Sequence, residues 1–311
     1  MFTTRRALGL LIGLSVCASS AMAQQLYIPL VSKGFQHQYW QAVKAGAEAA
    51  GKALNVRVSF EGPESEAMVD KQIDMLSAAL ARKPAAIGFA ALDSQAALPL
   101  LRKAQAAHIP IVSFDSGVDS DIPVTTAATD NKAAAALAAD KMAELIGRAG
   151  EVAIVAHDQT SRTGVDRRDG FVERVKAAYP NIRIVSIQYG GGDHLQSTEI
   201  AKSILQAYPK LKGIFGTNEG SAVGVANGVR EMRRSVVIVG YDSGKQQKDA
   251  IRSGLIAGAI TQNPVGIGYQ TVEAAVKALK GEKLPKHIDT GFYWYDKTNI
   301  NDPKIAAVLY D

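Results

Sequence analysis

The sequence predicts an α/β protein of two similar lobes, each a doubly wound parallel sheet, joined by a three-segment hinge. Three observations support this fold class. Short apolar runs rich in β-forming residues alternate with helical stretches, a pattern typical of βαβ units. The alternation occurs twice in similar order, and one further helix and strand follow the second copy. The composition, 47% hydrophobic and 21% charged over 311 residues, is that of a globular protein large enough for two cores.

Residues 1–23 have the pattern of a secretory signal peptide. Two arginines, Arg5 and Arg6, precede an apolar run that ends in a small-residue cleavage pattern before Gln24. The run is too short to span a membrane, and no later segment reaches ~18 apolar residues. We therefore expect export to the periplasm, through the general secretory route or, given the paired arginines, the twin-arginine route.

The exported chain is expected to carry no cysteine and little net charge. Cys17 is the only cysteine and lies within the predicted signal peptide, so the mature protein has no disulfide, thiol nucleophile or thiolate metal site. Without the two leader arginines, 33 basic and 30 acidic residues give a net charge of +3. The charges form no basic stripe, so we expect no nucleic-acid partner.

The first half of the mature chain contains five predicted strands with helical stretches between them. The helical patterns cover residues 39–54, 66–82 and 94–108. The predicted strands are residues 26–31, 56–60, 85–91, 110–114 and 124–128. Strand, helix and strand at this spacing predict one parallel sheet covered on both faces.

The second half repeats this order. Its predicted strands are residues 151–157, 181–189, 212–218, 236–242 and 257–262. The segment IVSFDSG at 111–117 matches IVGYDSG at 238–244, an offset of 127 residues that Ile87 and Ile214 share. Matching order over so long a segment indicates an internal duplication, and hence two lobes rather than one large domain.

The chain continues past the second copy with one more helix, residues 263–282, and one more strand, residues 290–296. The simplest arrangement returns the helix to the first lobe and the strand to the second. We therefore expect an N-terminal lobe of residues 24–128 plus 263–289 and a C-terminal lobe of residues 129–262 plus 290–311. Three crossings between lobes make a hinge that bends more easily than it twists.

Polar and aromatic residues follow the predicted strands of both lobes. Ligands of open parallel α/β sheets bind outside the carboxyl ends of the strands, so these side chains are expected to converge on a cleft between the lobes. The candidate ligand-binding residues are His37, Tyr39, Trp40, Asp115, Arg167, Asn218, Asp242 and Gln262.

The chemistry of this set favours a neutral polyhydroxylated ligand. Carboxylates accept hydrogen bonds from hydroxyl groups, arginine donates in a planar fork, and amides do both. Aromatic faces pack on the C–H surface of a sugar ring. The sequence contains no phosphate loop, zinc motif or nucleophile elbow. The histidines show no ligand-like spacing, so we expect no metal and no cofactor.

In these segments the sequence resembles the bacterial periplasmic sugar-binding proteins of the ribose, galactose and allose type, the substrate-binding components of ABC importers. The resemblance covers roughly residues 26–296 and is carried by GFQHQYWQAVKAGA, IPIVSFDSG, DRRDGF, GTNEGSAVG, VVIVGYDSG and AITQNP. It implies a monomer that binds a pentose, a hexose or a related polyol, with a membrane permease and its ATPase as partners and a chemoreceptor as a further one.

The resemblance also implies roles for individual residues. Asp115 and Asp242 resemble the hydroxyl-gripping carboxylates of the two lobes, and Arg167 resembles the arginine that contacts ring or anomeric oxygens. Asn218 and Gln262 match amide positions, Tyr39 and Trp40 match ring-stacking aromatics, and His37 stands where ribose binders often carry Asn. Three departures change the walls of the site: Ser116 replaces an arginine, Ala90 an amide and Gly192 an aromatic. We therefore expect a ligand other than ribose.

Two other functions remain open from the sequence. A secreted glycoside-processing enzyme would use Asp115 and Asp242 as its carboxylate pair, but neither is obviously placed for a raised pKa. A sensory receptor that presents its ligand to a chemoreceptor or sensor kinase would have the same sequence features. We favour a binding protein without enzymatic activity.

Overall fold

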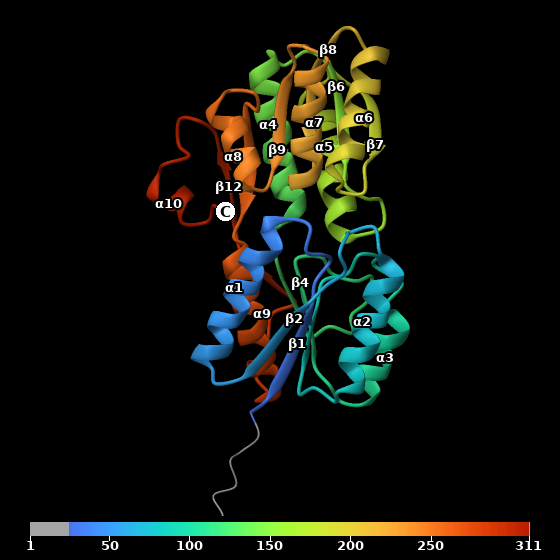
Figure 1. The fold of residues 1–311 in the computed structure, drawn as a ribbon, viewed down its shortest axis with the longest axis vertical. Helices are drawn as coiled ribbons and strands as arrows, with labels where there is room; N and C mark the ends of the chain where they lie inside the picture. Colours follow the sequence, from blue (N-terminus) through green and yellow to red (C-terminus); the bar gives the residue numbers. More distant parts are fainter. Residues whose placement is uncertain (1–24, 311) are drawn as a thin grey trace, which may run out of the picture.

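The computed structural model describes residues 25–310, which form two lobes stacked along the long axis of the molecule (Figure 1). The predicted signal peptide lies outside the described residues. No helix between residues 25 and 310 combines the length and apolar character needed to cross a bilayer.

The sheet of the N-terminal lobe has the order β11-β5-β4-β3-β1-β2, and all its pairs are parallel. Its strands are β1 (Tyr27–Val31), β2 (Arg57–Glu61), β3 (Ile87–Phe89), β4 (Ile111–Phe114), β5 (Thr125–Ala128) and β11 (His287–Asp289). Five of them lie where the sequence predicts strands. β11 is a short addition at the edge of the sheet that the sequence pattern does not predict.

The sheet of the C-terminal lobe repeats this topology as β12-β10-β9-β8-β6-β7. Its strands are β6 (Gly150–Ala156), β7 (Ile182–Tyr189), β8 (Leu211–Gly216), β9 (Val237–Tyr241), β10 (Gly258–Gln262) and β12 (Phe292–Tyr295). β9 occupies the place of β4, as the repeated DSG segment predicts. β12 pairs antiparallel with β10, whereas the other pairs are parallel.

Helices cover both faces of each sheet, which confirms the predicted α/β class. The N-terminal lobe carries α1 (Gln38–Ala53), α2 (Val69–Ala81), α3 (Leu98–Ala106) and α9 (Pro264–Leu279). The C-terminal lobe carries α4 (Asn131–Ile146), α5 (Arg162–Ala178), α6 (His194–Ala207), α7 (Glu219–Glu231), α8 (Lys245–Arg252) and α10 (Pro303–Ala306). Each lobe buries one apolar cluster on either side of its sheet.

Glycines let helices approach closely at equivalent places in the two lobes. A Cβ atom on Gly46 of α1 would lie 2.0 Å from the carbonyl oxygen of Val265 in α9. A Cβ atom on Gly170 of α5 would lie 2.5 Å from the carbonyl oxygen of Lys132 in α4. Any larger residue would have to separate the helices, so these two glycines set the packing distance of the paired helices.

The chain passes between the sheets three times: from β5 to α4, from β10 to α9, and from β11 to β12. α9 packs against α1 of the N-terminal lobe, whereas β12 joins the sheet of the C-terminal lobe. α9 therefore lies on the N-terminal lobe and β12 in the sheet of the C-terminal lobe.

Candidate functional site

The duplicated aspartates lie at the carboxyl ends of equivalent strands and share an unusual backbone conformation. Asp115 after β4 has φ 54°, and Asp242 after β9 has φ 78°. Aspartate tolerates this left-handed region better than most residues. Each backbone N–H still bonds a neighbouring strand, to Ala127 at 3.0 Å and Ile260 at 2.6 Å. The two turns therefore present the carboxylates of both lobes at the sheet ends that face each other.

A polar cavity of about 20 Å³ lies between the lobes. All eight residues predicted from the sequence line it: His37, Tyr39, Trp40, Asp115, Arg167, Asn218, Asp242 and Gln262. Four further residues complete its wall: Lys33, Glu66, His157 and Thr163. The structure thus brings the predicted set together, and its role in binding a ligand stays a prediction.

The two aromatic side chains of α1 are perpendicular to each other. Their ring centroids are 5.0 Å apart at an interplanar angle of 82°. The Tyr39 hydroxyl donates to Asp115 Oδ1 at 2.6 Å, and Trp40 Nε1 donates to Glu66 Oε1 at 2.8 Å. The polar atoms of both rings are satisfied by buried carboxylates, which fixes the orientation of the rings.

Asp242 is tied to two of the crossings between lobes. Gln262, the last residue of β10, donates from Nε2 to Asp242 Oδ1 at 2.7 Å. Thr129, between β5 and α4, donates in turn to Gln262 Oε1 at 2.8 Å. This chain of hydrogen bonds links a carboxylate of the cavity to the segments that would bend when the lobes move.

Arg167 stays charged although it is only 3% exposed. Its Nε donates to Asn131 Oδ1 at 2.7 Å, and its Nη1 donates to the carbonyl oxygen of Thr217 at 3.0 Å. The guanidinium carbon lies 3.9 Å from the ring centroid of Tyr241. Burial works to lower the pKa of Arg167, but the Tyr241 hydroxyl and the nearby carboxylates outweigh it and raise that pKa.

Burial and neighbouring groups have opposite effects on the pKa values of Asp115 and Asp242. Burial raises the pKa of Asp115, while Lys33, Arg167 and the Tyr39 hydroxyl work to lower it. Burial also raises the pKa of Asp242, against Arg167 and Gln262. In both cases burial prevails, because each carboxylate has exchanged water for a mostly enclosed site. The pKa of both carboxyls is therefore raised, and the expectation from the sequence that neither is placed for a raised pKa is wrong.

His37 and Asn218 form the wall near Gly192. Asn218 caps the N-terminus of α7, and His37 occupies the N-cap position of α1. Burial lowers the pKa of His37, which favours its neutral form, and its Nδ1 has no hydrogen-bond partner among residues 25–310. A Cβ atom on Gly192 would lie 2.9 Å from Asn218 Nδ2 and 3.4 Å from His37 Nε2. His37 and Asn218 therefore occupy space beside Gly192, where the resemblance places an aromatic ring.

Lys33 is the main residue that sequence reasoning missed. It follows β1, is 2% exposed, and lies 3.6 Å from both Glu66 Oε2 and Asp158 Oδ2. It also donates to Thr163 Oγ1 at 3.1 Å. Burial works to lower the pKa of Lys33, but the two carboxylates prevail and raise it. Its position directly after a strand was the available signal, the same signal that identifies Asp115.

The ion pairs also keep the surrounding groups in one charge state. Lys33 holds the pKa of Glu66 at about 2 against the opposing effect of burial. Burial lowers the pKa of His157 to about 3, so this imidazole is neutral, and its Nδ1 lies 2.8 Å from Thr217 Oγ1. The positive charge of Lys33 is therefore already matched by carboxylates.

Two arginines that follow β6 lie away from this site. Arg162 pairs with Asp119 and Asp166 at the surface, and Arg168 pairs with Asp169 and donates to Tyr189. Across residues 25–310, no cluster of three or more His, Cys, Asp or Glu side chains has a metal-binding arrangement.

The fold and site define a two-lobed binding protein with an enclosed hydrogen-bonding cavity between equivalent sheet ends. Residues 28–283 match the periplasmic binding protein domain, and the chain belongs to that family. The family is one of binding proteins rather than enzymes, as the sequence predicts.

Several characterised proteins are similar over most of the chain. The D-allose-binding periplasmic protein of Escherichia coli is 28% identical over 286 residues, which are 89% of this chain and 91% of that protein. A carbohydrate transporter solute-binding protein from Agrobacterium radiobacter, solved with D-arabinose, is 34% identical with a TM-score of 0.88. The alignment covers 92% of this chain and 99% of that one. A solute-binding protein from Agrobacterium vitis, solved with α-D-tagatopyranose, is 30% identical with a TM-score of 0.89, over 92% of this chain and all of that one.

Proposed function

We propose that this protein binds a neutral monosaccharide or related polyol between its lobes and delivers it to the permease of an ABC importer. The observation that carries the proposal is the cavity in which Asp115 and Asp242, one from each lobe, face the same enclosed space. Carboxylates accept hydrogen bonds from hydroxyl groups, and a cleft that encloses them from two sides encloses the ligand too.

The charges around the cavity support a neutral ligand. Lys33 already pairs with Glu66 and Asp158, and Arg167 lies near the carboxylates of Asp115 and Asp242. An anionic ligand such as a sugar acid or sugar phosphate would add negative charge to a cavity already lined by the carboxylates of Glu66, Asp115 and Asp242. Its burial would be costly for that reason.

The lining of the cavity supports the following ligand contacts. Asp115 and Asp242 accept hydrogen bonds from ligand hydroxyls, Arg167 donates to a ring or anomeric oxygen, and the Asn218 and Gln262 amides complete the polar contacts. Tyr39 and Trp40 pack against the C–H surface of the ring, and His37 closes the wall beside Gly192. Binding stabilises the closed state because the ligand touches both lobes only when they are together.

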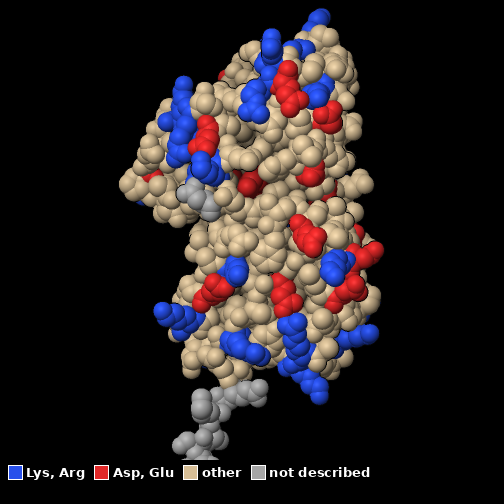
Figure 2. Space-filling view, in the orientation of Figure 1, with Lys and Arg blue, Asp and Glu red and all other residues tan. Residues whose placement is uncertain are grey.

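The proposed assembly has one ligand-binding chain and a membrane importer. Residues 24–128 plus 263–289 and residues 129–262 plus 290–311 are the two moving lobes. The protein acts as a periplasmic monomer, with the permease and its ATPase as partners and a chemoreceptor as an additional one. Acidic and basic side chains are interspersed on the face shown in Figure 2, which supports a function without nucleic acid.

A thermal-shift screen followed by calorimetry tests the proposal. The panel contains D-allose, D-ribose, D-arabinose, D-tagatose, D-fucose and neutral polyols, with a sugar acid and a sugar phosphate as charged controls. A ligand raises the unfolding midpoint because it binds only the folded protein. Stabilisation by a neutral sugar supports the proposal, whereas stabilisation by the charged compounds alone would refute it.

A further inference from the structure

Glu219 lies outside the cavity but at the junction of the two lobes. It is the first residue of α7 and is 6% exposed. Its carboxylate faces the first turn of α1, where the backbone N–H groups of Gln38 and Tyr39 work to lower its pKa. Its own backbone N–H donates to Asp242 Oδ2 at 3.0 Å. Glu219 therefore connects a cavity carboxylate of one lobe with a helix of the other.

Tyr310 reaches the same place from the end of the chain. The segment after β12 leaves the C-terminal lobe, forms α10 and returns to the junction (Figure 1). The Tyr310 hydroxyl donates to Glu219 Oε2 at 3.2 Å and accepts from the Ser243 N–H at 3.1 Å. Its ring lies edge-on to Tyr39, with centroids 6.0 Å apart, within an apolar cluster of the N-terminal lobe. Tyr310 thus contacts both lobes.

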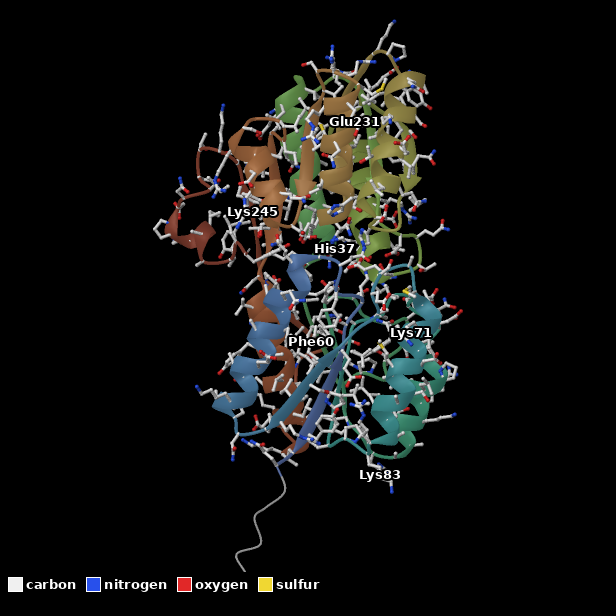
Figure 3. The ribbon with its side chains drawn as sticks, in the orientation of Figure 1. His37, Phe60, Lys71, Lys83, Glu231 and Lys245 are labelled. Carbon is white, nitrogen blue, oxygen red and sulfur yellow. The ribbon has the colours of Figure 1, made fainter. Side chains whose placement is uncertain are left out.

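Close packing around Glu219 indicates that the arrangement is specific. A Cβ atom on Gly244 would lie 2.4 Å from Glu219 Oε1 and would displace the carboxylate. The next residue, Lys245, donates its backbone N–H to Gln38 Oε1 at 2.7 Å, another bond between the lobes. Figure 3 shows Lys245 and His37 at this junction.

We propose that Glu219 and Tyr310 are positioning residues that hold the lobes in the closed arrangement, and so set the affinity for ligand and its dependence on pH without touching the ligand. This inference rests on the proposed function, because closure matters for affinity only if the ligand lies between the lobes. Neither residue lines the cavity. They act on α1, which carries Tyr39, and on Asp242.

The direction of the pH effect follows from the surroundings of Glu219. Burial raises its pKa to about 7, the Asp242 carboxylate adds to the rise, and Tyr310 and the α1 N–H groups oppose it. Other ionisable groups near it are Tyr295 of β12 and His37 at the start of α1. The Lys245 side chain pairs instead with Asp249 at the surface. A carboxyl with a higher pKa in the closed form takes up a proton on closure, so acid favours closure through Glu219.

The size of the effect follows from linkage. If Glu219 titrates near its usual value of 4.5 in the open form and near 7 in the closed form, its contribution to closure falls about tenfold between pH 6 and pH 8. Burial lowers the pKa of His37 and of His194, so each of these groups releases its proton on closure. Acid therefore opposes closure through the two histidines, whereas it favours closure through Glu219. The comparison of wild type with Glu219→Gln at each pH separates Glu219 from these groups.

The test measures the Kd of the best sugar from the screen by calorimetry at pH 6 and pH 8. Glutamine mimics the protonated carboxyl, so the ratio of wild-type Kd to Glu219→Gln Kd is expected to rise about tenfold from pH 6 to pH 8. Tyr310→Phe, which removes a donor to the carboxylate, is expected to weaken binding more at pH 8 than at pH 6. The matched control is Glu231→Gln, at the exposed far end of α7, which should leave a constant ratio (Figure 3).

A second measurement needs no ligand. Fluorescent labels on Lys71→Cys and Lys210→Cys, exposed residues of the two lobes, report the distance between lobes. The wild-type protein should be about as closed as Glu219→Gln at pH 6 and more open than Glu219→Gln at pH 8. A pH-independent Kd ratio would overturn the inference while leaving the proposed function intact. If no sugar binds, the proposed function fails, and identical label distances in wild type and Glu219→Gln at both pH values would overturn the inference as well.

Discussion

Asp242→Asn is the substitution that tests the candidate site most directly. Asparagine keeps the size of the side chain and tolerates the positive φ of 78° at this position, so the backbone turn can stay as it is. Alanine would add backbone strain of about 1 kcal/mol or more to the measured effect. The asparagine variant therefore isolates the loss of the charged acceptor.

The expected loss of affinity can be worked out from the contacts of the carboxylate. Asp242 accepts from Gln262 Nε2 at 2.7 Å and from the Glu219 N–H at 3.0 Å, one donor on each oxygen. An amide offers one acceptor, so one donor faces an NH₂ group and stays unsatisfied, at a cost of about 1–3 kcal/mol. A ligand hydroxyl loses a charge-assisted bond of about 1.5–3 kcal/mol. Together these losses predict about 2.5–6 kcal/mol, or an increase in Kd of about 70-fold or more.

Titration calorimetry with the best sugar of the screen measures this change, and circular dichroism checks that the variant is folded. Asp249→Asn is the matched control, because this carboxylate lies on α8 of the same lobe and pairs with Lys245 at the surface. The control should bind like wild type. A Kd for Asp242→Asn within about threefold of wild type would refute the assignment of Asp242 to the ligand site.

Three further predictions concern the scaffold of the site. Lys33→Met leaves the buried carboxylates of Glu66 and Asp158 without their cation and should lower the free energy of unfolding by about 3–5 kcal/mol, measured by chemical denaturation. The pKa of Glu66, about 2, lies below its usual 4.5, so its ionised form stabilises the fold above pH ~4.5 and this contribution is lost as the pH falls through about 2. Glu66→Gln should therefore unfold at a lower temperature at pH 7 and show a flatter decline between pH 5 and pH 2. Gly46→Ala places a Cβ atom 2.0 Å from the Val265 carbonyl oxygen and should cost about 1–3 kcal/mol of stability.

Each of these predictions has a control in the same region. Lys52→Met and Glu48→Gln change exposed charges of α1 and should have little effect. Gln41→Ala lies on the exposed side of the helix that carries Gly46. The contact behind each prediction would be contradicted by an unchanged variant. For Lys33→Met and Gly46→Ala this means a free energy of unfolding equal to that of wild type. For Glu66→Gln it means a decline in stability between pH 5 and pH 2 as steep as that of wild type.

The strands and helices were predictable because their signals are local. Apolar runs and helical periodicity predict eleven of the twelve strands in residues 25–310, and the repeated DSG segment places β4 and β9 at equivalent positions. β11 carries no such signal, because His287 and Asp289 are exposed and only Ile288 is partly buried. This strand forms because the edge of β5 offers partners, as in the bond from the Thr126 N–H to the Lys286 carbonyl oxygen.

The candidate site also has a part that local sequence signals predict and a part that they do not. The eight residues predicted from the strand ends all line one cavity, since parallel strands present their carboxyl ends at the same edge of a sheet. Lys33 was overlooked because an isolated lysine in a sequence is usually a surface residue. Its burial depends on Glu66 and Asp158, which come from distant segments of both lobes.

The sequence by itself determined the two lobes, their duplicated topology and the strand ends that carry the polar residues, because these follow from short-range periodicity and repetition. Only the tertiary structure decided which side chains pair across the lobes. Lys33 pairs with Asp158, the Lys245 N–H donates to Gln38, and Glu219 meets the first turn of α1. These pairings depend on how two separately folded sheets pack against each other, and that arrangement is the sum of many long-range contacts that no local pattern encodes.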